Sequence, residues 1–154
     1  MSGPSLFLAC SPGLSSLLRQ EAQELELKEL VESELGVHAR FSWDAMFRAS
    51  LGLHLASRVD ICMPEFQARR FDELRKKVSR QPWSRFIESG QRVCIRSKSN
   101  KSRLMHTGAV TQRVHEAIQD AVGGRVELVK PAEADGALRV NVTLKGNTCS
   151  LRVD

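Results

Sequence analysis

The segment Leu6-Phe7-Leu8-Ala9-Cys10-Ser11-Pro12-Gly13 indicates the fold class of the first part of the chain. Five apolar residues followed directly by Ser-Pro-Gly predict a buried strand that leads into a helix, with Ser11 as the N-cap and Pro12 at the first helical position. Leucines and Ala22 then recur at helical spacing as far as Leu25, with polar residues on the opposite side. The chain therefore begins with a strand and an amphipathic helix.

The following residues predict the rest of a first domain. We expect three further strands, and a helix with Asp44 as its N-cap. Because Phe47, Leu51 and Leu55 are four residues apart, we expect this helix to turn them toward the core. The strands are placed at residues 30–31, 37–42 and 59–63. The order strand, helix, strand, strand, helix, strand is that of a ferredoxin-like domain made of two split βαβ units.

The charge of the chain changes sign near Glu65. The whole sequence of 154 residues has a net charge of +5. Residues 1–65 hold 5 Lys and Arg against 9 Asp and Glu, a net −4, whereas residues 66–154 hold 18 against 9, a net +9. Such asymmetry between halves indicates a polyanionic partner for the basic half. We therefore expect two domains, a ferredoxin-like domain over 1–65 and a basic domain over 66–154.

The basic half has a mixed α/β pattern. A helix begins near Phe71, a short helix begins at Pro82, and a strand is expected at 93–95. A polar loop at 97–102 then leads to a longer helix, capped by Thr107 and stopped by glycines 123–124. Two alternating strands around residues 146–147 predict a C-terminal hairpin.

A cluster of cations around the 97–102 loop is the candidate binding site. No acidic residue lies between Arg92 and Arg113, and serines are interleaved with the cations, so charge and hydrogen-bond donors for phosphate oxygens occur together. The helix start near Thr107 would also favour an anion. The candidate RNA-binding residues are Arg96, Lys98, Lys101, Arg103, His106 and Arg113, extended by Lys76, Lys77, Arg80 and Arg85. Because tyrosine is absent and the other aromatic residues occupy core-like positions, we expect recognition of backbone shape in structured RNA rather than base stacking.

Signals for catalysis are absent from the sequence. It has no P-loop, GxGxxG, HExxH or GxSxG motif, and its histidines and cysteines do not pair at metal-ligand spacing. We therefore predict no catalytic residue, no metal site and no cofactor site in these 154 residues. The four cysteines are expected to be buried free thiols. No apolar run is long enough to span a membrane and the start does not resemble a signal peptide, so we expect a cytoplasmic protein.

Four segments carry a resemblance to a known family. They are LFLACSPGLSSLLRQEAQEL, MFRASLGLHLASRVDI, FDELRKKVSRQPWSRF and LRVNVTLKGNTCSLRVD. In order and spacing they resemble the amino-terminal part of bacterial ribosomal RNA guanine-N2 methyltransferases, in which a ferredoxin-like domain is followed by a THUMP domain, an RNA-binding α/β module. The resemblance covers essentially the whole chain.

The resemblance implies RNA capture for a catalytic domain that lies elsewhere. In the family a downstream methyltransferase domain holds S-adenosylmethionine, and no motif of that domain occurs here. The resemblance implies two partners, structured RNA, most naturally 23S ribosomal RNA, and a C-terminal methyltransferase domain. Because apolar and polar residues still alternate as in a strand where the sequence ends, we expect a fragment of a longer protein. Two alternatives stay open from the sequence. One is an RNA-binding or protein-interaction adaptor, and the other is the THUMP region of a tRNA-modifying enzyme.

Overall fold

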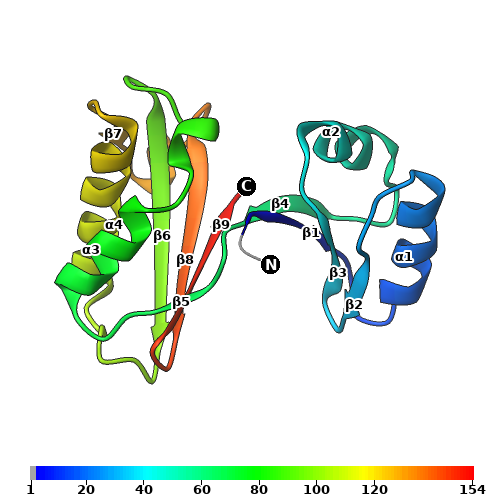
Figure 1. Ribbon diagram of the computed structural model, residues 1–154, viewed down its shortest axis with the longest axis horizontal. Coiled ribbons are helices and arrows are strands. Elements are labelled where there is room, and N and C mark those ends of the chain that lie inside the picture. Colours follow the sequence, from blue (N-terminus) through cyan, green and yellow to red (C-terminus); the bar gives the residue numbers. More distant parts are fainter. Residues whose placement is uncertain (1–2) are drawn as a thin grey trace. The chain divides into compact units, whose positions relative to one another are not determined.

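A computed structural model describes residues 3–154 (Figure 1). The chain divides into two compact units. The first runs to Pro64 and includes Asp154, and the second is Glu65–Val153. The expectation that 1–65 and 66–154 are separate domains stays a prediction. None of the helices within residues 3–154 is both long and apolar enough to cross a bilayer.

The first unit has the ferredoxin-like arrangement that the sequence predicts. Its elements are β1 (Ser5–Ala9), α1 (Ser15–Glu24), β2 (Val31–Ser33), β3 (Gly36–Arg40), α2 (Trp43–Gly52) and β4 (Arg58–Cys62). The strands lie in the order β2-β3-β1-β4, and each neighbouring pair is antiparallel. The central strand β1 buries Leu6 and Leu8 completely, and α1 contributes Leu18 and Ala22 to the same core.

The start of α1 differs from the prediction. The helix begins at Ser15 with Leu14 at the N-cap, whose side chain forms no capping bond, so Ser11 is not the cap. The Ser-Pro-Gly segment forms a turn instead, and Gly13 takes a φ of +89°, a conformation that favours glycine. Ser15 uses its hydroxyl to donate to the Ser33 carbonyl oxygen at 2.6 Å, which ties α1 to β2.

Helix α2 also differs, in its cap and in its buried face. The Ser42 Oγ accepts from the Ala45 N–H at 2.9 Å, so Ser42 and not Asp44 is the N-cap. The core face consists of the small residues Ala45 and Ala49, whereas Phe47 is 59% exposed.

The expected apolar face of α2 was therefore wrong at its larger residues. Leu51 is 88% exposed, and Leu55 lies beyond the end of the helix at Gly52. Trp43, expected at a core-like position, is 41% exposed. Alanines on the inner face let a helix approach its sheet closely, and spacing alone does not show which of two apolar faces packs inward.

The second unit is a mixed sheet with helices on one face. Its elements are β5 (Phe66–Gln67), α3 (Phe71–Ser79), a 3-10 turn η1 (Trp83–Arg85), β6 (Arg92–Asn100), α4 (Thr107–Val122), β7 (Glu127–Leu128), a second 3-10 turn η2 (Pro131–Glu133), β8 (Leu138–Lys145) and β9 (Thr148–Val153). The strand order is β7-β6-β8-β9, with β5 on the far side of β9. Strand β6 is parallel to β7 and β8, and the other pairs are antiparallel. Figure 1 shows α3 and α4 on the same side of this sheet.

Apolar residues on alternate strand positions pack against these helices. Trp83 is fully buried, and its Nε1 donates to the Val78 carbonyl at 2.7 Å, which fixes η1 to the end of α3. Helix α4 buries Val110, Val114, Ala117 and Ile118 and ends at Gly123 with a φ of 74°. The predicted hairpin between β8 and β9 is present, with Gly146 in the turn at a φ of 61°.

Candidate nucleic-acid interface

Residues 97–100 of the segment predicted as a polar loop form the end of a long strand. Strand β6 continues to Asn100 and pairs with β8 over eight residues in parallel register. Alternation along β6 places Arg96 and Lys98 on the face opposite α4, where both are exposed. The two cations are therefore held on a rigid strand and are not part of a mobile loop.

The serines between these cations are used inside the protein. Ser97 Oγ forms a hydrogen bond with Thr111 Oγ1 of α4 at 2.7 Å, and Ser99 Oγ donates to the Leu104 carbonyl at 2.8 Å. Ser102 is 4% exposed, and its Oγ accepts from the Leu104 N–H. The prediction that these hydroxyls donate to phosphate was wrong for Ser99, whose proton is used inside the fold, and Ser97 and Ser102 each also bind a group of the fold.

The true loop between β6 and α4 is short and alternates inward and outward side chains. Ser102 and Leu104 are buried and anchor it, whereas Lys101, Arg103 and Met105 are exposed. Lys101 has a φ of 54°, which turns the chain out of the strand. The anchors thus present two cations to solvent beside the start of α4.

His106, not Thr107, caps α4. Its Nδ1 accepts from the Ala109 N–H at 3.0 Å, and its carbonyl accepts from the Val110 N–H. Of the amides that a helix start leaves without an intrahelical partner, that of Ala109 is thereby occupied. The contribution of the helix start to anion binding stays a prediction, and the Lys101 and Arg103 side chains supply charge beside it.

The remaining candidate cations differ in what holds them. Lys77 pairs with Glu73 at 3.5 Å and donates to the Gln67 carbonyl at 2.6 Å. Arg113 pairs with Glu116 at 2.9 Å. Lys76 and Arg80 are exposed, and the Arg85 guanidinium lies 5.8 Å from the ring centre of Phe86. All four cations near α3, Lys76, Lys77, Arg80 and Arg85, come from the helical layer, away from the strand that carries Arg96 and Lys98.

A second feature of α3 and α4 is an ion-pair cluster between them. Arg75 contacts Glu116 at 2.6 Å and Asp120 at 2.9 Å. The hydrogen bond to Asp120 raises the pKa of Arg75 above its ordinary value. By contrast, Arg96, Lys98, Lys101 and Arg103 form no ion pair with any residue between 3 and 154. These four keep their charge available for a ligand.

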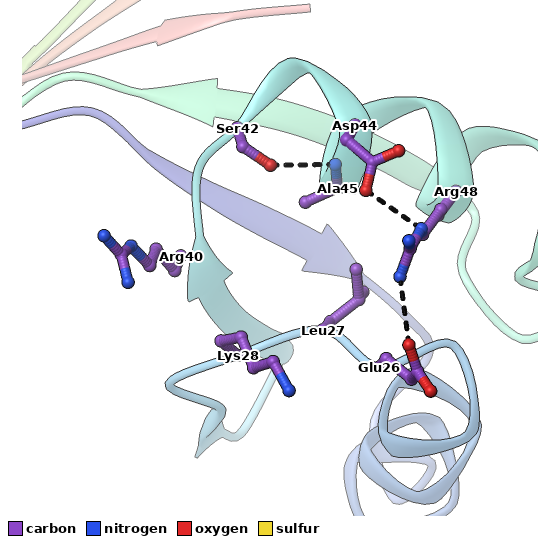
Figure 2. Close-up of a pocket in the computed structure, with 8 residues that line it drawn as sticks. All are labelled: Glu26, Leu27, Lys28, Arg40, Ser42, Asp44, Ala45 and Arg48. Carbon is purple, nitrogen blue, oxygen red and sulfur yellow. Dashed lines mark hydrogen bonds and ion pairs between the residues drawn. The ribbon is translucent and has the colours of Figure 1, made fainter.

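The first unit has a shallow pocket of about 310 Å³ beside α2 (Figure 2). It is lined by Glu26, Leu27, Lys28, Arg40, Ser42, Asp44, Ala45 and Arg48. Figure 2 shows Arg48 between two carboxylates, Asp44 at 3.0 Å and Glu26 at 3.5 Å. Both carboxylates of the pocket pair with Arg48, and Lys28 and Arg40 are its other two cations.

The described residues do not fit an S-adenosylmethionine site. Such a site needs a glycine-rich turn at the carboxyl end of a parallel strand and an acidic residue for the ribose hydroxyls. The carboxyl end of β6 leads into the basic 101–106 loop, and that of β8 leads into a hairpin. Among residues 3–154, no three His, Cys, Asp or Glu side chains are grouped to hold a metal ion.

Comparison with known protein families decides what the chain is. Residues 68–154 match the model of the THUMP domain, and residues 5–60 match that of the RlmL ferredoxin-like domain. The chain belongs to the THUMP domain family. The THUMP domain thus coincides with the unit that holds β6, its loop and α4, and the ferredoxin-like domain with the unit that holds β1 to β4.

Curated relatives of this THUMP protein are named ribosomal RNA large subunit methyltransferase K/L. The relative from Pseudomonas entomophila is 27% identical over 97% of this chain, and that from Methylococcus capsulatus is 29% identical over 96% of it. In both cases the match covers 20% of the relative. The chain therefore spans about a fifth of the length of the curated relatives it matches.

Solved structures share the fold. A predicted N6-adenine-specific DNA methylase from Listeria monocytogenes has a TM-score of 0.80 at 24% identity, with 97% of this chain and 40% of that chain covered. SMU.472, a candidate methyltransferase solved with SAH, has a TM-score of 0.81 at 21% identity, with 100% and 42% covered. The Pseudomonas entomophila relative and SMU.472 are both named as methyltransferases, and SMU.472 was solved in complex with SAH.

Proposed function

We propose that this chain is the RNA-binding region of an S-adenosylmethionine-dependent methyltransferase. It would hold structured RNA, 23S ribosomal RNA in particular, for guanine-N2 methylation by a catalytic domain outside these 154 residues. The curated relatives named for the ribosomal large subunit support this assignment. A protein with this role would act in the cytoplasm.

One observation carries the proposal. Over residues 92–106 the THUMP domain has five cations, Arg92, Arg96, Lys98, Lys101 and Arg103, and no carboxylate. Arg92 donates to the carbonyls of Glu133 and Asp135, whereas the other four are exposed. A row of uncompensated cations on a strand and its following loop suits the phosphates of RNA.

A charge-reversal variant tests the proposal. The variant is Lys98→Glu/Lys101→Glu/Arg103→Glu. We expect it to bind a stem-loop RNA at least 100-fold more weakly at 0.1 M salt, because each lost phosphate contact lowers the logarithm of the association constant by about 0.9 at that concentration. The melting temperature should stay close to that of the wild type, since the three side chains are exposed. Binding is measured by fluorescence anisotropy at 50, 100 and 200 mM KCl.

The matched control is Lys28→Glu/Arg40→Glu/Arg125→Glu, which makes the same change in net charge at exposed positions elsewhere. It should retain most of the affinity. Wild-type binding that is equally strong at all three salt concentrations would contradict the electrostatic mechanism. A wild-type chain that binds no RNA but forms a stable complex with a protein would favour an adaptor role.

A further inference from the structure

The sheet of the THUMP domain has a second face, opposite α3 and α4. At one end the segment that contains η2 covers it, where Cys94 of β6 is buried against Val129 and Ala134. The rest of this face is polar. On β8, the buried residues Val140, Val142 and Leu144 alternate with residues of the opposite face. Strand β6 alternates in the same way, with Ser97 turned toward α4. The face opposite the helices, here called the open face, consists of Arg96, Lys98 and Asn100 on β6, Arg139, Asn141, Thr143 and Lys145 on β8, and Thr148, Ser150 and Arg152 on β9.

Strand register places the cations of two strands side by side. Arg96 lies beside Asn141, Lys98 beside Thr143, and Asn100 beside Lys145. Neighbouring strands are about 4.8 Å apart. Because each residue advances about 3.3 Å along a strand, Arg139 and Lys145 are about 20 Å apart along β8. Arg96 and Lys98 occupy the interval on the next strand. The four cations therefore form a strip that spans several phosphates.

The strip lacks compensating acids. Residues 92–106 and 138–153 contain eight cations and not one Asp or Glu. Carboxylates occur at the edges of the open face. Glu65 accepts from Ser150 Oγ of β9 at 3.2 Å, and Glu133 and Asp135 belong to the η2 segment at the Cys94 end, where their carbonyls accept from Arg92. Arg96, Lys98, Arg139 and Lys145 are all exposed. The charge of the open face is complementary to a polyanion.

The open face also lacks aromatic residues. Phe66 of β5 is in register with the buried Cys149, which places Phe66 on the helix side. Its neighbour Gln67 lies on the open side, where its Nε2 donates to Thr148 Oγ1 at 3.0 Å. Sheets that bind single-stranded RNA stack unpaired bases on aromatic side chains, whereas double-stranded RNA is bound through phosphates and 2′-hydroxyls. Cations with amide and hydroxyl groups, and no rings, suit the second mode.

The open face is continuous with the loop that follows β6. The Gly146 N–H donates to the Asn100 carbonyl at 2.9 Å, so the β8–β9 turn adjoins the point where β6 ends and Lys101 begins the loop. Lys145 and Lys101 consequently lie at the same end of the sheet. A ligand bound to the open face can therefore extend onto the loop and contact positively charged side chains along its whole length.

We propose that the open face binds the phosphodiester backbone of double-stranded RNA, with Arg139 and Lys145 as phosphate contacts beside Arg96 and Lys98. Asn141 and Thr143, between the two β8 cations, donate to phosphate or 2′-hydroxyl oxygens. This inference rests on the proposed RNA-binding function and specifies its substrate class as paired rather than unpaired RNA.

The test uses the full 154-residue chain and the variant Arg139→Gln/Lys145→Gln. The probes are a fluorescein-labelled 20-base-pair RNA hairpin and an unpaired RNA of equal length, at 50, 100 and 200 mM KCl. Loss of two phosphate contacts should weaken hairpin binding about 60-fold at 100 mM and make the slope of log K against log salt shallower by about 1.8. The wild type should bind the hairpin more tightly than the unpaired strand.

Two controls separate local contact from general charge and from folding. Lys28→Gln/Arg40→Gln removes the same charge from exposed positions of the ferredoxin-like domain and should change affinity less than threefold. Arg139→Lys/Lys145→Arg keeps both charges and should bind as the wild type does. Far-ultraviolet circular dichroism and melting temperature should agree among all variants.

The outcomes distinguish this inference from the proposed function. If Arg139→Gln/Lys145→Gln binds the hairpin like the wild type while Lys98→Glu/Lys101→Glu/Arg103→Glu does not, the open-face site is wrong and the RNA-binding function stands. Equal losses in Arg139→Gln/Lys145→Gln and Lys28→Gln/Arg40→Gln, or tighter binding of the unpaired strand by the wild type, would also overturn the inference. A wild type that binds neither RNA would remove both.

Discussion

The His106 cap of α4 gives a prediction that separates stability from RNA contact. The His106 Nδ1 accepts from the Ala109 N–H at 3.0 Å, and Gly108 leaves room for the ring, because a Cβ there would lie 3.2 Å from its Cε1. His106→Ala removes this acceptor. Loss of a helix N-cap costs about 1 kcal/mol, within a range of about 0.5–2. In a domain of this size that corresponds to a fall of about 4–8 °C in melting temperature.

His106→Asn is the matched variant, because asparagine is among the preferred N-cap residues. We expect it to melt within about 1–2 °C of the wild type. Its affinity for the hairpin should stay within about twofold of the wild-type affinity. The His106 Nδ1 already accepts the cap bond, so the ring has little more than one further hydrogen bond to offer RNA. Thermal unfolding followed by circular dichroism, together with anisotropy titration, measures both effects.

Two results would refute this reasoning. An unchanged melting temperature in His106→Ala would mean that the cap bond does not stabilise α4. A large loss of RNA affinity in His106→Asn, with unchanged stability, would make His106 a direct RNA contact, as the sequence predicts, rather than a residue that positions the helix start.

Two further predictions concern titratable groups. Glu21 accepts from the backbone N–H groups of His54 and Leu55; burial opposes its ionisation, but these bonds outweigh it and lower its pKa below 4.5. A carboxyl whose pKa is lower in the folded than in the unfolded chain stabilises the fold at pH values above its unfolded pKa, and this stabilisation is lost as pH falls. Glu21→Gln should therefore be less stable than the wild type at pH 7 in urea unfolding, and the difference in unfolding free energy should shrink toward pH 3.5. A difference that stays constant with pH would contradict this. Burial, aided by the Glu65 carboxylate, raises the pKa of Cys149 to about 12. Iodoacetamide at pH 8 should therefore leave Cys149 unmodified in the folded chain and modify it in urea. Peptide mass spectrometry measures the modification. The half-buried Cys62 is the internal comparison, and equal rates at both cysteines would contradict the prediction.

Local sequence patterns predicted the elements well where one signal dominated. The apolar run at Leu6–Cys10 became the central strand of the first sheet, Gly123 ended α4, and Gly146 formed the turn of the last hairpin. Each of these depends on a property that the residue carries by itself, either burial of apolar surface or access to positive φ. The ferredoxin-like order and the THUMP domain followed from such elements and from the family resemblance.

Local patterns failed where two neighbouring groups competed for one role. Ser42 and Asp44 are both good caps, and only the path of the chain into α2 selects Ser42. Phe47 and Ala49 are both apolar, and only the closeness of the sheet selects the alanine side. The Ser97–Ser102 segment is polar enough for a loop, yet pairing with β8 keeps its first half in a strand.

The sequence by itself determined the amount of charge in this protein and the half of the chain that carries it, because the balance of −4 and +9 is a count of residues. Only the tertiary structure decided which cations are available. Partners distant in sequence take up some of them, as Glu116 and Asp120 do with Arg75. Strand pairing brings Arg139 and Lys145, about forty residues further along the chain, beside Arg96 and Lys98. A binding surface depends on distances between side chains, and across paired strands those distances are set by the register of the sheet rather than by separation in sequence.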